Sequence, residues 1–116
     1  MSSPEGYPET FRQGQGKPVT VGISNHERQP VNYTVVVSIQ RVDSGGDAVT
    51  EAERLERFRV YVEDGSSIDR RHVLAPTLTG ERLRVQYLLY KGQPPADPSA
   101  ANAYRKLHFW TSVTDV

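Results

Sequence analysis

The stretch Val31-Asn32-Tyr33-Thr34-Val35-Val36-Val37-Ser38-Ile39-Gln40-Arg41-Val42 decides the fold class of this chain. Its residues Val31, Tyr33, Val35, Val37 and Ile39 are apolar and recur at every second position, with mostly polar residues between them. Because the side chains of a β-strand alternate between two faces, this pattern predicts a strand with one buried face and a firm register. Val36 falls on the opposite face, so its replacement by threonine should cost much less stability than truncation of Val37.

The alternation continues on both sides of this stretch. It predicts strands over residues 18–24, 58–62, 68–75, 82–91 and 104–114, joined by short turns and by one Pro-rich loop over residues 92–103. No helix is long enough for a βαβ crossover, so most of the pairing should be antiparallel. The sequence therefore predicts an all-β antiparallel sandwich of about six to seven strands. Its predicted core residues are Val21, Tyr33, Val35, Val37, Val85, Tyr87, Leu89, Leu107 and Phe109.

The first residues of the chain have a different composition. Residues 1–17 are polar and rich in Gly, Pro, Ser and Gln, which is typical of flexible chain. We therefore expect a flexible lead-in over residues 1–17 and one β-sandwich domain over residues 18–116, a size that fits a single core.

Residues 48–57 allow two interpretations. Their composition favours a helix, yet only Val49, Ala52 and Leu55 are apolar, which is too few for a stable amphipathic helix. A short helical turn and an extended charged segment both stay open. The charged residues of this segment mix both signs, as a solvated face does more often than a catalytic carboxylate pair: Glu51, Glu53, Arg54, Glu56 and Arg57.

The charge balance argues against nucleic acid as a partner. The chain has 14 Lys and Arg against 14 Asp and Glu, whereas nucleic-acid binders usually carry a basic excess. It has no cysteine, which excludes disulfides, thiol nucleophiles and Cys-based zinc sites. No apolar run is long enough to cross a membrane, and the first residues do not resemble a signal peptide, so we expect any targeting segment to lie upstream.

Candidate catalytic and metal-binding residues are few. The three histidines lie in a turn and in two different predicted strands, without the close spacing typical of zinc ligands. We interpret His26 and His108 as polar surface residues, and His72 as a half-buried residue with satisfied hydrogen bonds. The sequence therefore predicts no catalytic residue, no metal and no cofactor.

Aromatic residues indicate a candidate contact face. By strand phase, Tyr90, Trp110 and Tyr61 lie on the side away from the core, and His108 shares the side of Trp110. Clustered exposed aromatic residues mark contact surfaces, which makes Tyr90, His108 and Trp110 a candidate binding face. The alternatives are an error in the assigned strand phase and a packing role for these residues beneath the Pro-rich loop.

The triplet Asn32-Tyr33-Thr34 is an acceptor sequence for N-glycosylation. Asn32 falls on the polar face of its predicted strand, where a glycan has room. Asn32 is therefore a candidate glycosylation site if the domain lies outside the cell.

Several stretches together resemble a known family. They are Val19-Thr20-Val21-Gly22-Ile23-Ser24-Asn25-His26-Glu27, Val31-Asn32-Tyr33-Thr34-Val35-Val36-Val37, Pro76-Thr77-Leu78-Thr79-Gly80-Glu81, Tyr87-Leu88-Leu89-Tyr90-Lys91-Gly92 and Asn102-Ala103-Tyr104-Arg105-Lys106-Leu107-His108-Phe109-Trp110. In this order, over about residues 7–114, they are similar to the C-terminal soluble domain of the archaeal domain-of-unknown-function family 1616, common in haloarchaea. The chain departs from that family in having no membrane helices, and we expect it to lack the opening strand ahead of Tyr7.

The resemblance implies an immunoglobulin-like domain, exposed outside the cell and tethered by membrane helices absent from this chain. It implies no catalytic residues. We therefore expect a non-enzymatic interaction or structural module at the cell surface, with a protein or a glycan as its partner. Two alternatives are a carbohydrate-binding sandwich that uses Trp110, Tyr90 and His108, and an accessory domain of a glycan-handling enzyme.

Overall fold

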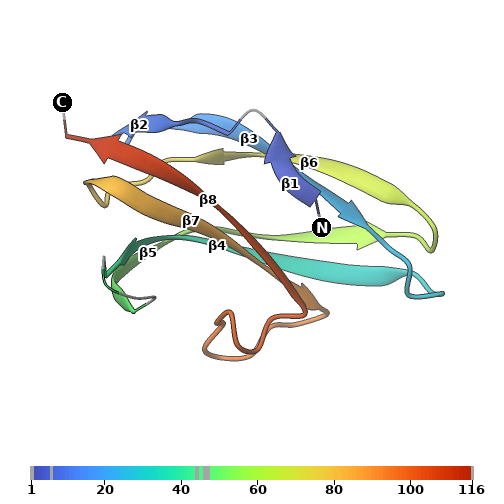
Figure 1. Ribbon diagram of the computed structural model, residues 1–116. Coiled ribbons are helices and arrows are strands. Elements are labelled where there is room, and N and C mark those ends of the chain that lie inside the picture. Colours follow the sequence, from blue (N-terminus) through green and yellow to red (C-terminus); the bar gives the residue numbers. More distant parts are fainter. Residues whose placement is uncertain (1, 6, 44, 46–47, 116) are drawn as a thin grey trace.

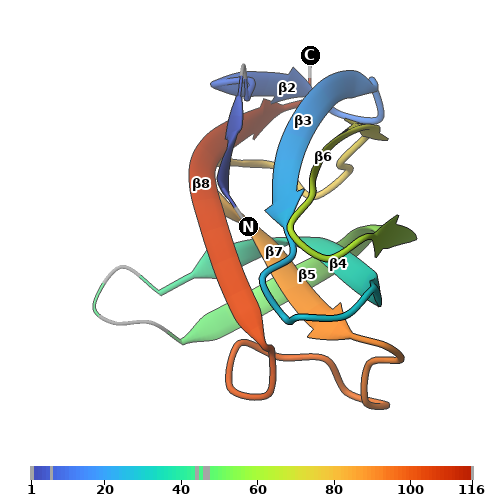
Figure 2. The same cartoon turned by 90° about the vertical axis from the view of Figure 1, so that its right-hand side faces the viewer.

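The chain forms two β-sheets with the apolar core between them. The computed structural model describes residues 2–5, 7–43, 45 and 48–115, and within these residues all regular secondary structure is β-strand. One sheet has the order β1-β3-β6 and the other the order β2-β8-β7-β4-β5 (Figure 1; Figure 2 gives the view from the side). The predicted all-β sandwich is therefore confirmed. The strands are β1 (Ser2–Glu5), β2 (Thr10–Arg12), β3 (Lys17–Ser24), β4 (Val31–Val42), β5 (Val49–Val62), β6 (Ser67–Leu74), β7 (Gly80–Lys91) and β8 (Arg105–Thr114).

The strand order is that of an immunoglobulin-like domain. All strand pairs are antiparallel except β2 and β8, which run parallel. Strands β1, β3 and β6 occupy the places of immunoglobulin strands A, B and E, while β4, β7 and β8 occupy those of C, F and G. Strand β5 extends the second sheet beyond β4 and forms its edge.

The nine predicted core residues all face the space between the sheets. Eight of them are buried, and Leu107 is half-buried against the same cluster. Tyr33 and Tyr87 are among the largest fully buried side chains, and the register of β4 against β7 places Val37 opposite Tyr87. The period of two in the sequence therefore assigned the faces of these strands correctly.

A polar contact joins the two sheets inside this core. His72 of β6 is buried, and its Nε2 atom lies 2.5 Å from the Tyr87 hydroxyl of β7. The Phe58 ring packs on the other side of His72, with ring centroids 5.3 Å apart. The predicted hydrogen bonding of His72 is confirmed, but the residue is buried rather than half-buried as we expected. Burial lowers the pKa of His72 and raises the pKa of Tyr87, so both groups are neutral at pH 7.

The expected flexible lead-in over residues 1–17 is wrong for the described part of that segment. Strand β1 pairs with β3, and β2 pairs with β8. Phe11 in β2 is completely buried, and Tyr7 stacks on Phe109 with ring centroids 4.7 Å apart. Burial of Phe11 and stacking of Tyr7 on Phe109 outweigh the polar composition of their neighbours. The opening strand that we expected to be missing ahead of Tyr7 is therefore present as β1.

Truncation of a valine to alanine should lower stability much more in the core than on the surface. We expect Val37→Ala to lower the free energy of unfolding by about 1 to 3 kcal/mol through lost burial and a residual cavity. The same truncation at Val73, which is 55% exposed on the three-stranded sheet, should change it by less than about 0.5 kcal/mol. Chemical denaturation of both variants measures the two values, and equal losses would contradict the burial of Val37.

His72 should make stability depend on pH. Its pKa is lower in the folded chain than in the unfolded chain, so the unfolded chain binds the proton more readily. The contribution of neutral His72 to the free energy of unfolding is complete above about pH 6.5. It is lost as the pH falls below that value, at a slope of at most about 1.4 kcal/mol per pH unit. We expect His72→Gln to flatten the stability curve between about pH 6.5 and pH 5. Parallel curves for wild type and His72→Gln in urea titrations would refute this role.

Candidate functional site

One extra residue in β5 determines which side chains face outward from the five-stranded sheet. Residues 49–57 form the first part of this strand rather than a helical turn. In the register with β4, Glu56 lies opposite Val37 and Arg54 lies opposite Ser38, so Leu55 has no partner of its own. This is a β-bulge, and it reverses the alternation of residues 51–54, up to a second register shift between Arg41 and Val42 of β4.

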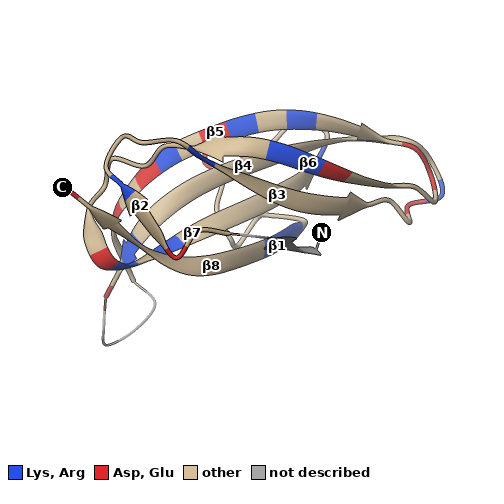
Figure 3. Ribbon diagram, turned by 90° about the horizontal axis from the view of Figure 1, so that it is seen from above, with Lys and Arg blue, Asp and Glu red and all other residues tan. Residues whose placement is uncertain are grey.

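The bulge sorts the charges of β5 by sign. Arg54, Arg57 and Arg59 lie opposite residues of β4 whose side chains point away from the core. Glu51, Glu53 and Glu56 lie opposite Arg41, Ile39 and Val37, which point to the other side. Figure 3 shows acidic and basic positions interspersed along the β5 ribbon. In space they separate, with arginine on the outer side and glutamate on the inner side.

Two neighbouring strands add cations to the same side. Arg84 of β7 and Lys106 of β8 point outward, because Arg84 pairs with Gln40 and Trp110 and Lys106 pairs with Leu88. Arg82 of β7 lies on the same side, over the Trp110 ring. The two ion pairs of the described residues, Arg41–Glu51 and Lys91–Glu27, include none of these cations. We call this surface the outer basic face, and it consists of Arg54, Arg57, Arg59, Arg82, Arg84 and Lys106.

A groove of about 520 Å³ crosses the outer basic face. Arg84 lies in it, and its Nε atom donates a hydrogen bond of 2.8 Å to Oε1 of Gln40. Gln40 in turn donates to Gln86 over 3.1 Å, and Gln86 is buried. These bonds hold the Arg84 guanidinium in place from behind. The groove is lined by Val36, Ser38, Gln40, Val49, Ala52, Arg54, Arg84, Gln86, Leu88, Pro98, Ser99, Ala100 and Ala101.

The Pro-rich loop covers the apolar end of the groove. Val36, Leu88 and Tyr90 form a small buried cluster on the outer side of the sheet, with Ala100 and Ala103 packed on it. Figure 2 shows this loop in orange, between β7 and β8. Val36 is only 3% exposed, so our expectation that its replacement costs little stability is wrong. The cover comes from residues distant in sequence, which strand phase does not reveal.

Tyr90 is also a packing residue and not part of an exposed face. It is 5% exposed, and its hydroxyl donates to Oδ1 of Asn102 over 2.7 Å and accepts from the Ser99 backbone N–H over 3.1 Å. Burial raises its pKa. Strand phase placed Tyr90 on the correct side of the sheet. The Pro-rich loop nevertheless covers it, in agreement with the alternative of a packing role beneath that loop.

The other aromatic candidates remain accessible. Trp110 is half-buried, and the guanidinium carbon of Arg82 lies 3.9 Å from the centroid of its ring. His108 is exposed and meets Trp110 edge-on, with ring centroids 5.9 Å apart. Tyr61 is 52% exposed and pairs across the strands with Asn32. The structure therefore brings His108 and Trp110 together and leaves Tyr90 beneath the loop.

Asn32 is exposed on the outer side of β4. Thr34, the third residue of its acceptor triplet, is buried, and its hydroxyl donates to the Gly92 carbonyl over 2.7 Å. Glycosylation of Asn32 stays a prediction.

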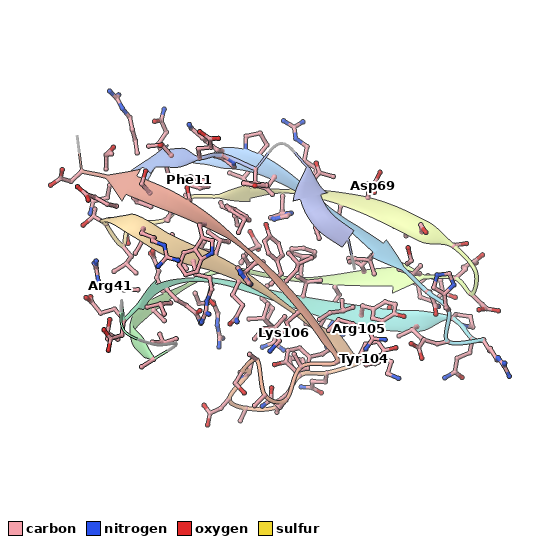
Figure 4. All side chains as sticks on the ribbon, in the orientation of Figure 1. Phe11, Arg41, Asp69, Tyr104, Arg105 and Lys106 are labelled. Atoms are coloured by element: carbon pink, nitrogen blue, oxygen red, sulfur yellow. The ribbon has the colours of Figure 1, made fainter. Side chains whose placement is uncertain are left out.

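The carboxylates with perturbed pKa values hold loops together. Burial alone would raise the pKa of Glu53, but hydrogen bonds from the Thr77 side chain and from the backbone of Thr77 and Leu78 lower it. A hydrogen bond from the Tyr104 hydroxyl lowers the pKa of Glu27, and Lys91 adds to this effect. Figure 4 shows Tyr104 and Arg105 where the Pro-rich loop enters β8.

The histidines are dispersed. His26 lies between β3 and β4, His72 in the core and His108 on the outer side. The described residues contain no group of three His, Cys, Asp or Glu side chains with the geometry of a metal site.

A larger cleft, of about 1000 Å³, lies between β2, the end of β8 and residues 79–81. Its lining mixes the cations Arg12 and Lys17 with the acids Glu81 and Asp115. This mixture favours no particular charge on a ligand.

The outer basic face was not predicted from the sequence. The sequence did contain a signal for it. The spacing within Glu51, Glu53 and Glu56 and within Arg54, Arg57 and Arg59 mixes two and three residues, and each set recurs at every second position only if Leu55 is left out of the count. We interpreted this segment as mixed and solvated because the bulge depends on the partner strand.

Comparison with known proteins places the chain in a family. No curated protein matches it. Within the described residues, the structure has no helix of the length and apolarity that a membrane span requires. The family model for a domain of unknown function, DUF1616, matches residues 2–112, nearly the whole chain. This chain is therefore a member of the DUF1616 family.

Proposed function

We propose that this domain is a non-enzymatic interaction module on the outer side of a membrane and that it contacts its partner through the outer basic face. The observation that carries the proposal is the gathering of six cations on one side of a chain with no net charge, three from β5 and three from β7 and β8. Side chains on one face of a strand recur about every 7 Å, so these cations repel one another. A partner with negative charge would relieve that repulsion.

The positions of the perturbed titratable groups support a module without chemistry of its own. Glu53 fixes residues 77–78, Glu27 fixes Tyr104, and His72 bridges the sheets through Tyr87. Each of these groups already has a structural partner. A catalytic group instead presents its perturbed proton to a cleft.

The proposed location follows from the family resemblance. Members typically carry membrane helices ahead of a soluble domain outside the cell. The outer basic face suits contact with acidic segments of neighbouring surface proteins. The glycan alternative has less support, because Tyr90 is buried and Arg82 covers a face of the Trp110 ring. A sugar that stacked there would have to displace Arg82.

Site-specific photocrosslinking tests the contact surface. A benzophenone amino acid at position 108, on the outer side of the five-stranded sheet, should give a covalent adduct in the natural protein within its source cells. The matched control is the same photoreactive residue at position 73, which is exposed on the opposite sheet. We expect adducts from position 108 and few from position 73. Adducts only from position 73, or none from either, would overturn the proposed surface.

Protease access tests the location. Proteinase K added to intact source cells should degrade the domain within its natural protein, while a cytoplasmic marker survives. Protection of the domain in intact cells, followed by degradation after lysis, would place it inside and refute the proposed location.

A further inference from the structure

We infer that the groove beside the Pro-rich loop binds an acidic peptide segment, with acidic side chains on Arg84 and Arg54 and a neighbouring apolar side chain against the loop. This inference rests on the proposed function and adds the chemical class of the partner. The groove combines the two features that such a segment needs. One end has two arginines, and the other has aliphatic side chains.

Arg84 is oriented for a planar anion. Its Nε atom is held by Gln40, and Gln86 holds Gln40. Within the described residues, no carboxylate forms an ion pair with Arg84. A guanidinium fixed at Nε still presents its two terminal nitrogens as a fork, the geometry that pairs with a carboxylate through two parallel hydrogen bonds.

Arg54 provides a second cation at the groove. It lies opposite Ser38, and Ser38 lies opposite Gln86 on the far side of β4. Arg54 and Arg84 therefore come from strands on either side of β4 and, with Arg84 two residues along β7 from Gln86, lie about 12 Å apart at the backbone. Arg54 is exposed, and its long side chain lines the groove from the β5 side. Two cations at this spacing suit an extended peptide with more than one acidic residue.

The apolar end favours a peptide over other polyanions. Val36 and Leu88 are buried beneath it, so Pro98 and Ala100 of the loop provide its accessible apolar surface. None of the lining residues is aromatic. Sugars and nucleobases stack on aromatic rings, whereas an aliphatic pocket accepts an apolar amino-acid side chain. The lining therefore matches a peptide in which acidic residues flank an apolar one.

Titration of the 116-residue chain with defined peptides tests the inference. The probe is a capped peptide of about eight residues with three glutamates around one leucine. Controls replace its glutamates by glutamine or its leucine by serine. Trp110 pairs with Arg84 and is the only tryptophan, so its emission reports on binding. We expect saturable binding of the probe, and at least about tenfold weaker binding of either control, since both ends of the groove contribute.

Two matched variants separate the groove from general charge. Arg84→Gln and Arg59→Gln each remove one cation from the outer basic face, but Arg59 does not line the groove. Arg84→Gln should weaken binding of the probe by about tenfold or more, and Arg59→Gln should weaken it by less than about threefold. Arg84→Lys keeps the charge without the fork, and it should also bind more weakly than wild type. Thermal melts confirm that each variant is folded.

The outcomes distinguish this inference from the proposed function. Equal weakening by Arg84→Gln and Arg59→Gln, or preferential binding of polygalacturonate or single-stranded DNA, would overturn the peptide groove. Failure of the probe together with adducts from position 108 would reject the acidic peptide alone. Failure of both would reject the contact surface as well.

Discussion

The extra residue at Leu55 sets the phase on which the surface of the five-stranded sheet depends. Downstream of it, Phe58, Val60 and Val62 must face the core, because they complete the apolar layer between the sheets. Upstream, a regular strand would turn Glu53 outward and Arg54 inward. The bulge instead lets Glu53 reach Thr77 and Leu78 in the connection from β6 to β7. One register shift therefore stabilises a crossover between the sheets and places Arg54 on the outer side with Arg57 and Arg59.

The parts of the fold that could be predicted are those with strong local alternation. Apolar residues recur at every second position over residues 31–39 of β4 and over residues 83–89 of β7, so the faces of these strands and the core around Tyr33 and Tyr87 followed from the sequence. Phe11 could not be found this way, because one apolar residue in a three-residue strand has no period. Val36 and Tyr90 were placed on the correct side but not recognised as buried, because the loop that covers them is remote in sequence.

The candidate site was predicted only in its location. Strand phase identified the outer side of β7 and β8 as a contact surface, and His108 and Trp110 do lie there. The chemistry differs from the expectation of an aromatic platform. Trp110 packs against the guanidinium of Arg82, so here the ring supports a cation. Arg84 owes its orientation to Gln40 and Gln86, contacts between strands that a single sequence does not display.

The edge position of β5 has a consequence for the behaviour of the protein at high concentration. Strand β5 is 14 residues long and is hydrogen-bonded on one side only, by β4, so its free backbone edge resembles a template for aggregation. If two copies paired there, arginines would meet across the new ladder on one side and glutamates on the other, and like charges placed opposite each other destabilise a sheet. The bulge further disturbs the straight edge that fibrils require. The arrangement that presents cations to a partner thereby also keeps copies of the domain from joining edge to edge.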